Sequence, residues 1–180
     1  MIKLIATDLD NTLLDKDGSV PPETVAALAK AEEKGVTVTV ATGRSFASAR
    51  GVAEMIGGNG LAICYNGSQI RRLADGMVLY SGCVDKDVQR GIIEFVHERG
   101  LYLQMYDNDE IVVETLRLDK HNDPDLHFAS HREVGDFLKE SLFDTPKMMI
   151  AADPEEVPAL QARLLVGGAL GERALSGRSL

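Results

Sequence analysis

The chain opens with MIKLIATDLDNTLL, residues 1–14, in which an apolar run ends in two carboxylates one residue apart. The run Ile2–Ala6 has the length and composition of a buried strand. Because side chains i and i+2 share one face of a strand, Asp8 and Asp10 are predicted to project together from its carboxyl end. Two such close charges need a shared proton or a cation, and carboxylate oxygens suit Mg²⁺. The stretch therefore predicts a magnesium site at Asp8 and Asp10, the alternative being two acids that only cap the strand.

This stretch resembles the first motif of the haloacid dehalogenase (HAD) superfamily of phosphohydrolases, Asp-x-Asp-x-Thr at the end of the first strand. The resemblance implies that Asp8 is the nucleophile that takes the phosphoryl group. It also implies that Asp10 is the general acid and then the general base. The chemistry agrees with this implication, because a carboxylate is a known phosphoryl acceptor in covalent catalysis.

Length and composition limit the class of protein. The 180 residues suggest one domain, or one domain plus a small insertion, and a net charge of −9 does not favour nucleic acid or an anionic membrane as a partner. A phosphorylated substrate remains compatible with that charge, because a bound cation can reverse the local field. We find no apolar stretch long enough to span a bilayer and no secretory leader, and two cysteines make no disulfide scaffold. A cytoplasmic location is therefore expected, with no presequence before the first strand.

A helix and a second strand follow the opening motif. Prolines in Ser19–Glu23 predict a helix start, and Gly35 stands where a helix would end in a left-handed residue. In Val36–Val40, valines alternate with threonines, which is typical of a strand. The order β-α-β with a short crossover predicts two parallel strands.

The second strand ends in Ala41-Thr42-Gly43-Arg44-Ser45, before a predicted helix over residues 46–56. Parallel strands place Thr42 at the same sheet edge as Asp8, where open α/β sheets bind ligands. The Thr42 hydroxyl, the Gly43 amide and the helix N-terminus together predict a phosphate site. Arg44 could add a bidentate clamp on a phosphate or a substrate carboxylate. The alternative is that Thr42 caps the helix and Arg44 lies on the surface.

The sequence Thr-Gly-Arg is similar to the second motif of the Cof-type subgroup of the HAD superfamily, and this implies that Thr42 is a phosphate ligand. A third strand is predicted over Leu61–Cys64, followed by the turn signal Asn66-Gly67. In the Cof-type proteins a similar Asn-Gly lines the active-site cleft, so the resemblance makes Asn66 a candidate substrate contact. A plain turn is the alternative. Residues 69–72 and 77–80 are predicted to form a hairpin.

The pattern changes from about Gly82. We expect a helix from Asp85 to Arg99, a hairpin of residues 101–106 and 111–114, and an irregular charged stretch over 117–131. A helix over 132–142, a strand over 147–152 and a helix over 154–165 capped by Asp153 should follow. This order resembles the mixed α/β cap of the Cof-type family, which implies a lid that excludes water and selects the leaving group.

The predicted fold class is α/β, with a Rossmann-like parallel-sheet HAD core and an inserted α+β cap. The expected domains are the N-terminal part of the core over residues 1–82, the cap over 83–165 and an irregular tail over 166–180.

Three histidines, His121, His127 and His131, lie in the charged stretch. His127 and His131 have the i, i+4 spacing of a zinc pair on a helix. Pro124 and the acidic residues around it favour a solvated loop instead. A loop of the cap could also bring one of these histidines to a substrate.

The sequence departs from the family pattern after the predicted cap. A complete Cof-type protein supplies a lysine and an acidic metal-binding motif there, whereas residues 166–180 are glycine-rich and show no period. We therefore expect a truncated, incomplete core. Loss of these groups should lower the rate of phosphoryl transfer by orders of magnitude. An exposed sheet edge should lower stability or cause self-association.

The function predicted from these features is a Mg²⁺-dependent phosphatase. Its substrate would be a small phosphorylated metabolite such as a sugar phosphate, and it would act through an aspartyl phosphate on Asp8. One alternative is a catalytically impaired fragment that acts at most as a phosphate-binding or interaction module. Another is a receiver-like phosphoacceptor domain, which the position of the acid pair after the first strand disfavours.

Overall fold

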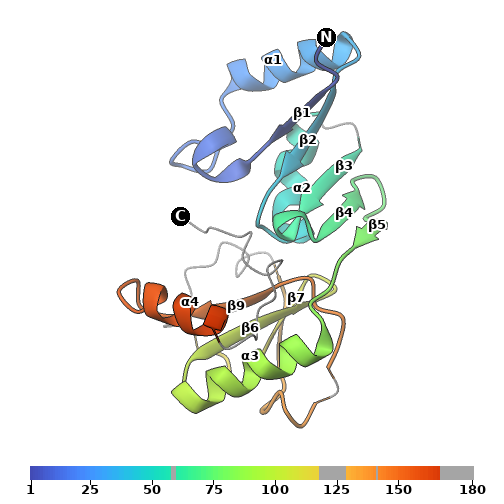
Figure 1. Cartoon of the computed structure of the whole chain (residues 1–180). Coiled ribbons are helices and arrows are strands. Elements are labelled where there is room, and N and C mark those ends of the chain that lie inside the picture. Colours follow the sequence, from blue (N-terminus) through green and yellow to red (C-terminus); the bar gives the residue numbers. More distant parts are fainter. Residues whose placement is uncertain (58–59, 118–128, 141, 167–180) are drawn as a thin grey trace. The chain divides into compact units, whose positions relative to one another are not determined.

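The computed structural model describes residues 1–57, 60–117, 129–140 and 142–166. The chain divides into two compact units, Met1–Gly82 and Cys83–Leu180, hereafter the N-terminal and C-terminal units (Figure 1). Each unit has its own sheet, of five strands in the first and four in the second. None of the described helices has the length and apolar composition needed to cross a membrane.

The sheet of the N-terminal unit has the strand order β1-β2-β3-β4-β5. The first three strands, β1 (Leu4–Thr7), β2 (Thr37–Ala41) and β3 (Leu61–Cys64), are parallel, which confirms the predicted β-α-β order. A hairpin of β4 (Gln69–Arg72) and β5 (Val78–Ser81) continues the sheet in antiparallel fashion. Because β1, β2 and β3 run in one direction, the segments that follow them all leave from the same edge.

Two helices accompany this sheet, α1 (Pro22–Glu33) and α2 (Phe46–Met55). Gly35 follows α1 with φ of +80°, as its position in the sequence predicts. The Ser45 hydroxyl begins α2 by accepting the Ser48 N–H. The core of this unit is buried around β2 and α2, and includes Val38, Val40, Ala49, Ala53 and Ile56.

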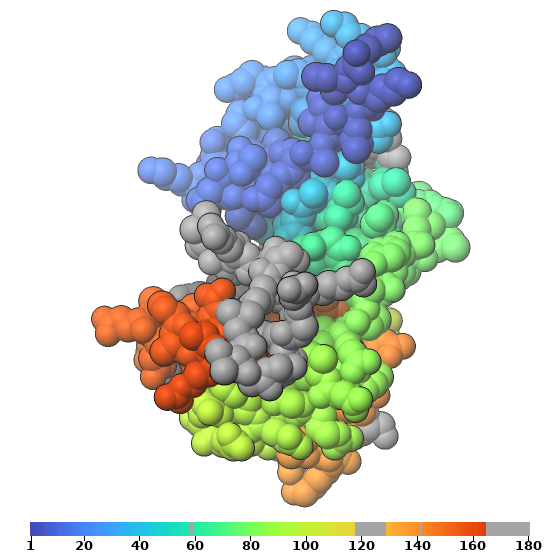
Figure 2. All heavy atoms as spheres, viewed as in Figure 1, coloured from blue at the N-terminus to red at the C-terminus, as the bar shows by residue number. Residues whose placement is uncertain are grey.

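The prediction that the first strand is buried is wrong. β1 lies at the edge of the sheet, and the side chains of Ile2 and Leu4 are 71% and 56% exposed. Figure 2 shows the dark blue atoms of the first residues at the surface. No described strand pairs with the outer side of β1, and α1 contains no buried residue, so the expected exposed sheet edge is present here.

The C-terminal unit has a sheet of order β8-β7-β6-β9, formed by β6 (Tyr102–Asp107), β7 (Glu110–Val113), β8 (His131–Glu133) and β9 (Met148–Ala151). The helix α3 (Lys86–Arg99) begins at Asp85, whose carboxylate accepts the Asp87 N–H at 2.8 Å. It ends at the left-handed Gly100. Both ends of α3 are as predicted. Apolar side chains of α3, the sheet and the loop after β8 form the core, which includes Ile92, Ile93, Val96, Leu103, Met105, Val112 and Phe137.

Two predictions for the C-terminal unit are wrong. A helix was expected over residues 132–142, but residues 131–133 form β8, which pairs in parallel with β7 and is followed by the left-handed Gly135. The last helix, α4 (Val157–Val166), begins three residues later than expected. Before it, the Asp153 carbonyl accepts the Glu156 N–H in a turn.

The position of His131 in β8 bears on the predicted zinc pair. His131 lies in this strand and not on a helix, which removes the helical spacing that a zinc pair with His127 requires. His121 and His127 lie outside the described residues, as do most of the predicted irregular stretch and the tail from residue 167.

Candidate active site

The two N-terminal carboxylates lie in a turn directly after β1 and not within the strand itself. β1 ends at Thr7, and Asp8 continues in extended conformation with φ of −73° and ψ of 159°. Asn11 has φ of +57°, a left-handed conformation that asparagine tolerates and that turns the chain sharply. The Leu14 N–H then donates to the Leu9 carbonyl at 2.9 Å, which closes the turn.

Two buried leucines fix this turn to the N-terminal unit. Leu9 is fully buried and Leu13 is nearly so, whereas Asp8 and Asp10 on either side of Leu9 are exposed. Burial of an apolar side chain of this size stabilises its position by about 1.5–3 kcal/mol. The leucines thus hold a short polar segment at the carboxyl end of β1.

The Asp10 carboxylate forms a two-point ion pair with Arg44. Arg44 Nη2 lies 2.6 Å from one oxygen of Asp10, and Arg44 Nε lies 3.0 Å from the other. The two residues are 34 positions apart in the chain. This pair joins the turn after β1 to the turn after β2.

The segment after β2 is fixed mainly by its backbone. Thr42 is buried, its N–H donates to the Ile63 carbonyl at 3.0 Å, and its hydroxyl accepts the Arg44 N–H at 3.2 Å. The Arg44 carbonyl accepts the Tyr65 N–H at 3.0 Å. The turn after β2 is therefore hydrogen-bonded to β3 and to the turn that follows it.

Asn66 reaches the same edge from β3. Its φ is +56°, and its N–H donates to the Thr42 carbonyl at 3.0 Å. Its side chain lies against Gly43, since a methyl group built on Gly43 would stand only 2.7 Å from the Asn66 Oδ1 atom. Asn66 is thus a turn residue that lies next to the Thr-Gly-Arg segment, and its contact with a substrate stays a prediction.

Together, Asp10, Thr42, Gly43, Arg44 and Asn66 form the sheet-edge cluster, with Asp8 in the turn that carries Asp10. Among the described residues, nothing forms a hydrogen bond or an ion pair with the Asp8 carboxylate. The exposed Asp8 carboxylate offers oxygen ligands of the kind that a hard cation prefers. The Asp10 carboxylate itself is engaged by Arg44.

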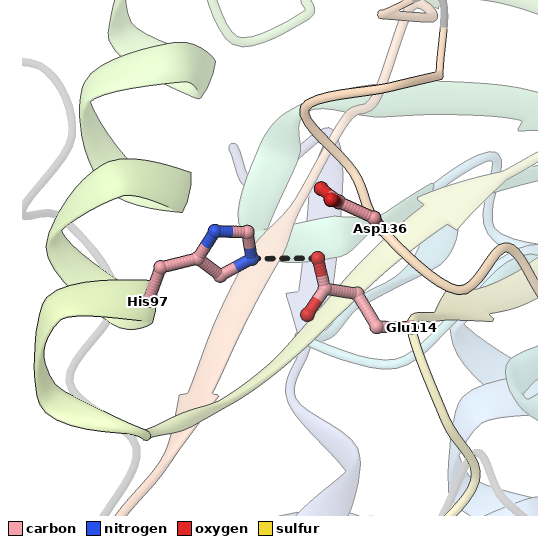
Figure 3. A group of neighbouring side chains, drawn as sticks. All are labelled: His97, Glu114 and Asp136. Carbon is pink, nitrogen blue, oxygen red and sulfur yellow. Dashed lines mark hydrogen bonds and ion pairs between the residues drawn. The ribbon is translucent and has the colours of Figure 1, made fainter.

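A second polar cluster lies in the C-terminal unit and was not predicted. His97, Glu114 and Asp136 come from the last turn of α3, the residue after β7 and the loop after β8 (Figure 3). One donor atom of each lies within 4.8 Å of the others. Glu114 Oε1 is 2.6 Å from His97 Nε2 and accepts the Phe137 N–H at 2.7 Å. We call this set the His97 cluster.

The carboxylate of Asp136 in this cluster is also partnered. It accepts the Leu138 N–H at 2.9 Å, and its other oxygen pairs with Lys139 Nζ at 2.8 Å. The hydrogen bond from Lys139 is the main reason that the pKa of Asp136 lies below its usual value. A metal ion would have to displace these partners. We therefore interpret the His97 cluster as a brace between α3 and the loop after β8.

The fold and the sheet-edge cluster define a class: an α/β protein in which a carboxylate-bearing turn and a threonine-glycine-arginine turn meet at the carboxyl edge of parallel strands. Residues 5–165 match the family of haloacid dehalogenase-like hydrolases, and the chain belongs to that family. The resemblance stated from the sequence is confirmed.

One relative and two solved structures are similar to this chain. The HMP-PP phosphatase of Yersinia pestis (strain Pestoides F) is 29% identical over 173 residues, which cover 91% of this chain and 59% of the relative. A haloacid dehalogenase-like hydrolase from Bacteroides thetaiotaomicron has a known structure that is 24% identical with a TM-score of 0.77, and the match covers 93% of this chain and 64% of that one. A sugar phosphatase of HAD subclass IIB shares the fold at 21% identity and a TM-score of 0.68, covering 89% and 62%. The chain thus spans about three fifths of the length of these relatives.

Proposed function

We propose that the protein is a Mg²⁺-dependent phosphatase of small phosphomonoesters that works through an aspartyl phosphate. The observation that supports this most is the sheet-edge cluster, which brings together polar groups from the ends of three strands beside the turn that carries Asp8. Within the part of the chain that the structure describes, nothing pairs with the Asp8 carboxylate. Family membership and the relatives' names point to the same reaction type. The substrate class, a small phosphorylated metabolite, is part of the proposal.

Asp8 is the proposed nucleophile. A carboxylate oxygen of Asp8 attacks phosphorus, the bond from phosphorus to the ester oxygen breaks, and the leaving oxygen takes a proton from Asp10. Water then attacks phosphorus, gives its proton to Asp10, and frees inorganic phosphate and the Asp8 carboxylate. Asp8 suits this task because it is exposed and is not used to cap the turn.

The phosphoryl oxygens would be held by the turn after β2. The Thr42 hydroxyl already accepts the Arg44 N–H, so its own proton remains available to donate to a phosphoryl oxygen. Asn66 would contact the substrate next to Gly43, where only a glycine leaves space for its side chain. Phosphoryl transfer depends mainly on such positioning and on charge stabilisation.

Magnesium fits the donor set at this edge. The Asp8 carboxylate and the Asp10 main-chain oxygen are hard oxygen donors, and neither is a soft ligand that would favour another metal. When bound there, Mg²⁺ would supply positive charge that offsets the negative charge on Asp8 and on the phosphoryl oxygens.

The test is an activity assay on the purified chain with Mg²⁺. Phosphate release would be measured from a panel of sugar phosphates, nitrophenyl phosphate and HMP-PP, with Asp8→Asn as the matched variant. The proposal expects release that requires Mg²⁺ and falls by at least about a thousandfold in Asp8→Asn, since removal of a nucleophile costs orders of magnitude. Release that Asp8→Asn leaves unchanged would overturn the role of Asp8.

The alternative, a phosphate-binding module without turnover, predicts a different result. Calorimetry would then detect binding of inorganic phosphate or a sugar phosphate, and Thr42→Val would weaken it, although no phosphate is released. No observation favours this alternative over the phosphatase, because the Asp8 carboxylate has no part in merely binding an anion.

A further inference from the structure

The proposed function gives no role to one contact of the site, the ion pair between the side chains of Arg44 and Asp10. Two parallel bonds of 2.6 and 3.0 Å match the fork geometry in which a guanidinium fixes the plane of a carboxylate. The side chain of Arg44 is only 15% exposed, whereas that of Asp10 is 46% exposed. The arginine therefore approaches Asp10 from the protein side, and the solvent side of the carboxylate stays open.

The arginine is itself held in place. The main-chain N–H of Arg44 donates to the Thr42 hydroxyl, and its main-chain carbonyl accepts the Tyr65 N–H from the turn after β3. A guanidinium on so constrained a backbone loses little freedom when it pairs, and it can orient its partner accurately.

We propose that Arg44 is a positioning residue, which acts by fixing the plane of the Asp10 carboxyl group and not by clamping the substrate. This inference rests on the proposed function, and it departs from the sequence-based prediction of Arg44 as a phosphate clamp. Each carboxylate oxygen has two lone pairs, so both oxygens of Asp10 retain a free position after they pair with Arg44. One of these positions can exchange a proton with the ester oxygen or with water.

The two roles for Arg44 predict different dependence on the leaving group. An alkyl phosphate needs a proton on its leaving oxygen, whereas nitrophenyl phosphate leaves as a stabilised anion and needs little help from an acid. Arg44→Lys keeps a positive charge but replaces the two-point fork by a single ammonium. The experiment measures kcat and KM of wild type and Arg44→Lys with a sugar phosphate and with nitrophenyl phosphate, in the presence of Mg²⁺.

If Arg44 positions Asp10, Arg44→Lys should lower kcat for the sugar phosphate by about ten- to a hundredfold, a loss no larger than the usual contribution of general acid catalysis. For nitrophenyl phosphate the drop should be less than about threefold, and KM should change little for either substrate. A rise in KM of equal size for both substrates would overturn the inference in favour of a phosphate clamp. Equal losses of kcat on both substrates would overturn it as well, because they would indicate a general structural defect.

Arg50→Lys is the matched control. Arg50 lies in the same unit, on α2, and pairs with Glu54 on the surface at 2.7 Å. This control should leave both substrates within about twofold of wild type, because a surface pair of this kind contributes little.

A double-mutant cycle keeps the inference testable without turnover. Midpoints of thermal unfolding are compared for wild type, Asp10→Asn, Arg44→Met and the double variant. Coupling is expected, so that the double variant loses less than the sum of the single losses. Additive losses would overturn the pairing on which the inference depends.

The result of the cycle is interpreted together with the activity assay. If the two residues are coupled but the wild type releases no phosphate, the proposed function is overturned, and the positioning role of Arg44 with it. Coupling together with equal losses on both substrates would overturn only the role of Arg44.

Discussion

The sheet-edge cluster and the His97 cluster contain similar side chains but differ in what is left unsatisfied. In the His97 cluster, the carboxylates of Glu114 and Asp136 both accept main-chain N–H groups and also contact basic side chains. In the sheet-edge region, Asp8 has no such partner among the described residues. The two regions therefore differ in the partners of their carboxylates more than in their composition, and this difference is why we propose a reactive role for Asp8 and a structural one for Glu114 and Asp136.

The backbone beneath the two clusters also differs. The sheet-edge cluster stands on turns that contain the left-handed residues Asn11, Tyr65 and Asn66, close to the ends of parallel strands. The His97 cluster instead links a helix end to a loop over a well-packed core. Backbone conformations that cost energy are retained where they position functional groups, and this supports chemistry at the sheet edge and bracing in the C-terminal unit.

The largest expected effect on stability comes from Glu114→Ala. This change removes the acceptor of the Phe137 N–H and the partner of His97, and an unsatisfied amide costs about 1–3 kcal/mol. Urea unfolding followed by circular dichroism would measure the loss. Turnover per folded molecule should stay near that of wild type if the cluster only braces the unit.

The control for this change is Glu98→Ala, which removes an exposed glutamate from the same helix end. It should alter the free energy of unfolding by less than about 0.5 kcal/mol. Equal losses in the two variants would contradict the bracing role of Glu114.

The next largest expected effect is weaker substrate binding, measured as a higher KM, in Gly43→Ala. The new methyl group would meet the Asn66 side chain at 2.7 Å, and because that side chain is exposed it can move away at little cost in stability. If Asn66 contacts the substrate, KM should rise about tenfold, equivalent to one hydrogen bond. Steady-state kinetics would measure this rise, and Asn66→Ala should match it.

Gly51→Ala is the control for Gly43→Ala. Gly51 lies inside α2 with open space around it, so alanine should stabilise the protein by about 0.5–1 kcal/mol and leave KM unchanged. If KM rose equally in the two alanine variants, the contact between Gly43 and Asn66 would have no part in binding.

The smallest expected effect is a pH-dependent change in stability when Asp136 is replaced. The hydrogen bond from Lys139 and then the Leu138 N–H lower the pKa of Asp136 in the folded state. A lowered folded pKa stabilises the protein above the ordinary aspartate pKa, and this stabilisation is lost as the pH falls through the folded value. Asp136→Asn should therefore lower the midpoint of thermal unfolding slightly at neutral pH and not at strongly acidic pH. A difference that is constant with pH would contradict this cause, and a Lys139→Met background should shrink it.

Much of the framework could be predicted from local patterns. The alternating valines of residues 36–40 gave β2, and the capping pair of Asp85 and Gly100 gave the ends of α3, because these signals depend on neighbouring residues alone. Residues 131–133 were assigned to a helix because their strand character comes from pairing with β7, which no local pattern reveals.

The candidate site shows the same limit. The prediction that Thr42 and Asn66 lie at the sheet edge needed only the direction of the strands. The shape of the turn at Asp10 depended on the left-handed Asn11, and the pair with Arg44 joins residues 34 positions apart. Neither follows from spacing, so the sequence offered Arg44 as a clamp on a phosphate or a substrate carboxylate, or as a surface residue, and did not reveal its pair with Asp10.

The most direct test of the central claim, that the reactive carboxylate is Asp8, is to trap the phosphorylated protein. The chain is mixed with Mg²⁺ and a ³²P-labelled sugar phosphate, quenched in acid and digested, and the labelled peptide is identified by mass spectrometry. The account predicts a hydroxylamine-sensitive label on the peptide that contains Asp8, absent in Asp8→Asn and present in Glu114→Gln. Label that persists in Asp8→Asn, or turnover by wild type without any trapped label, would contradict it.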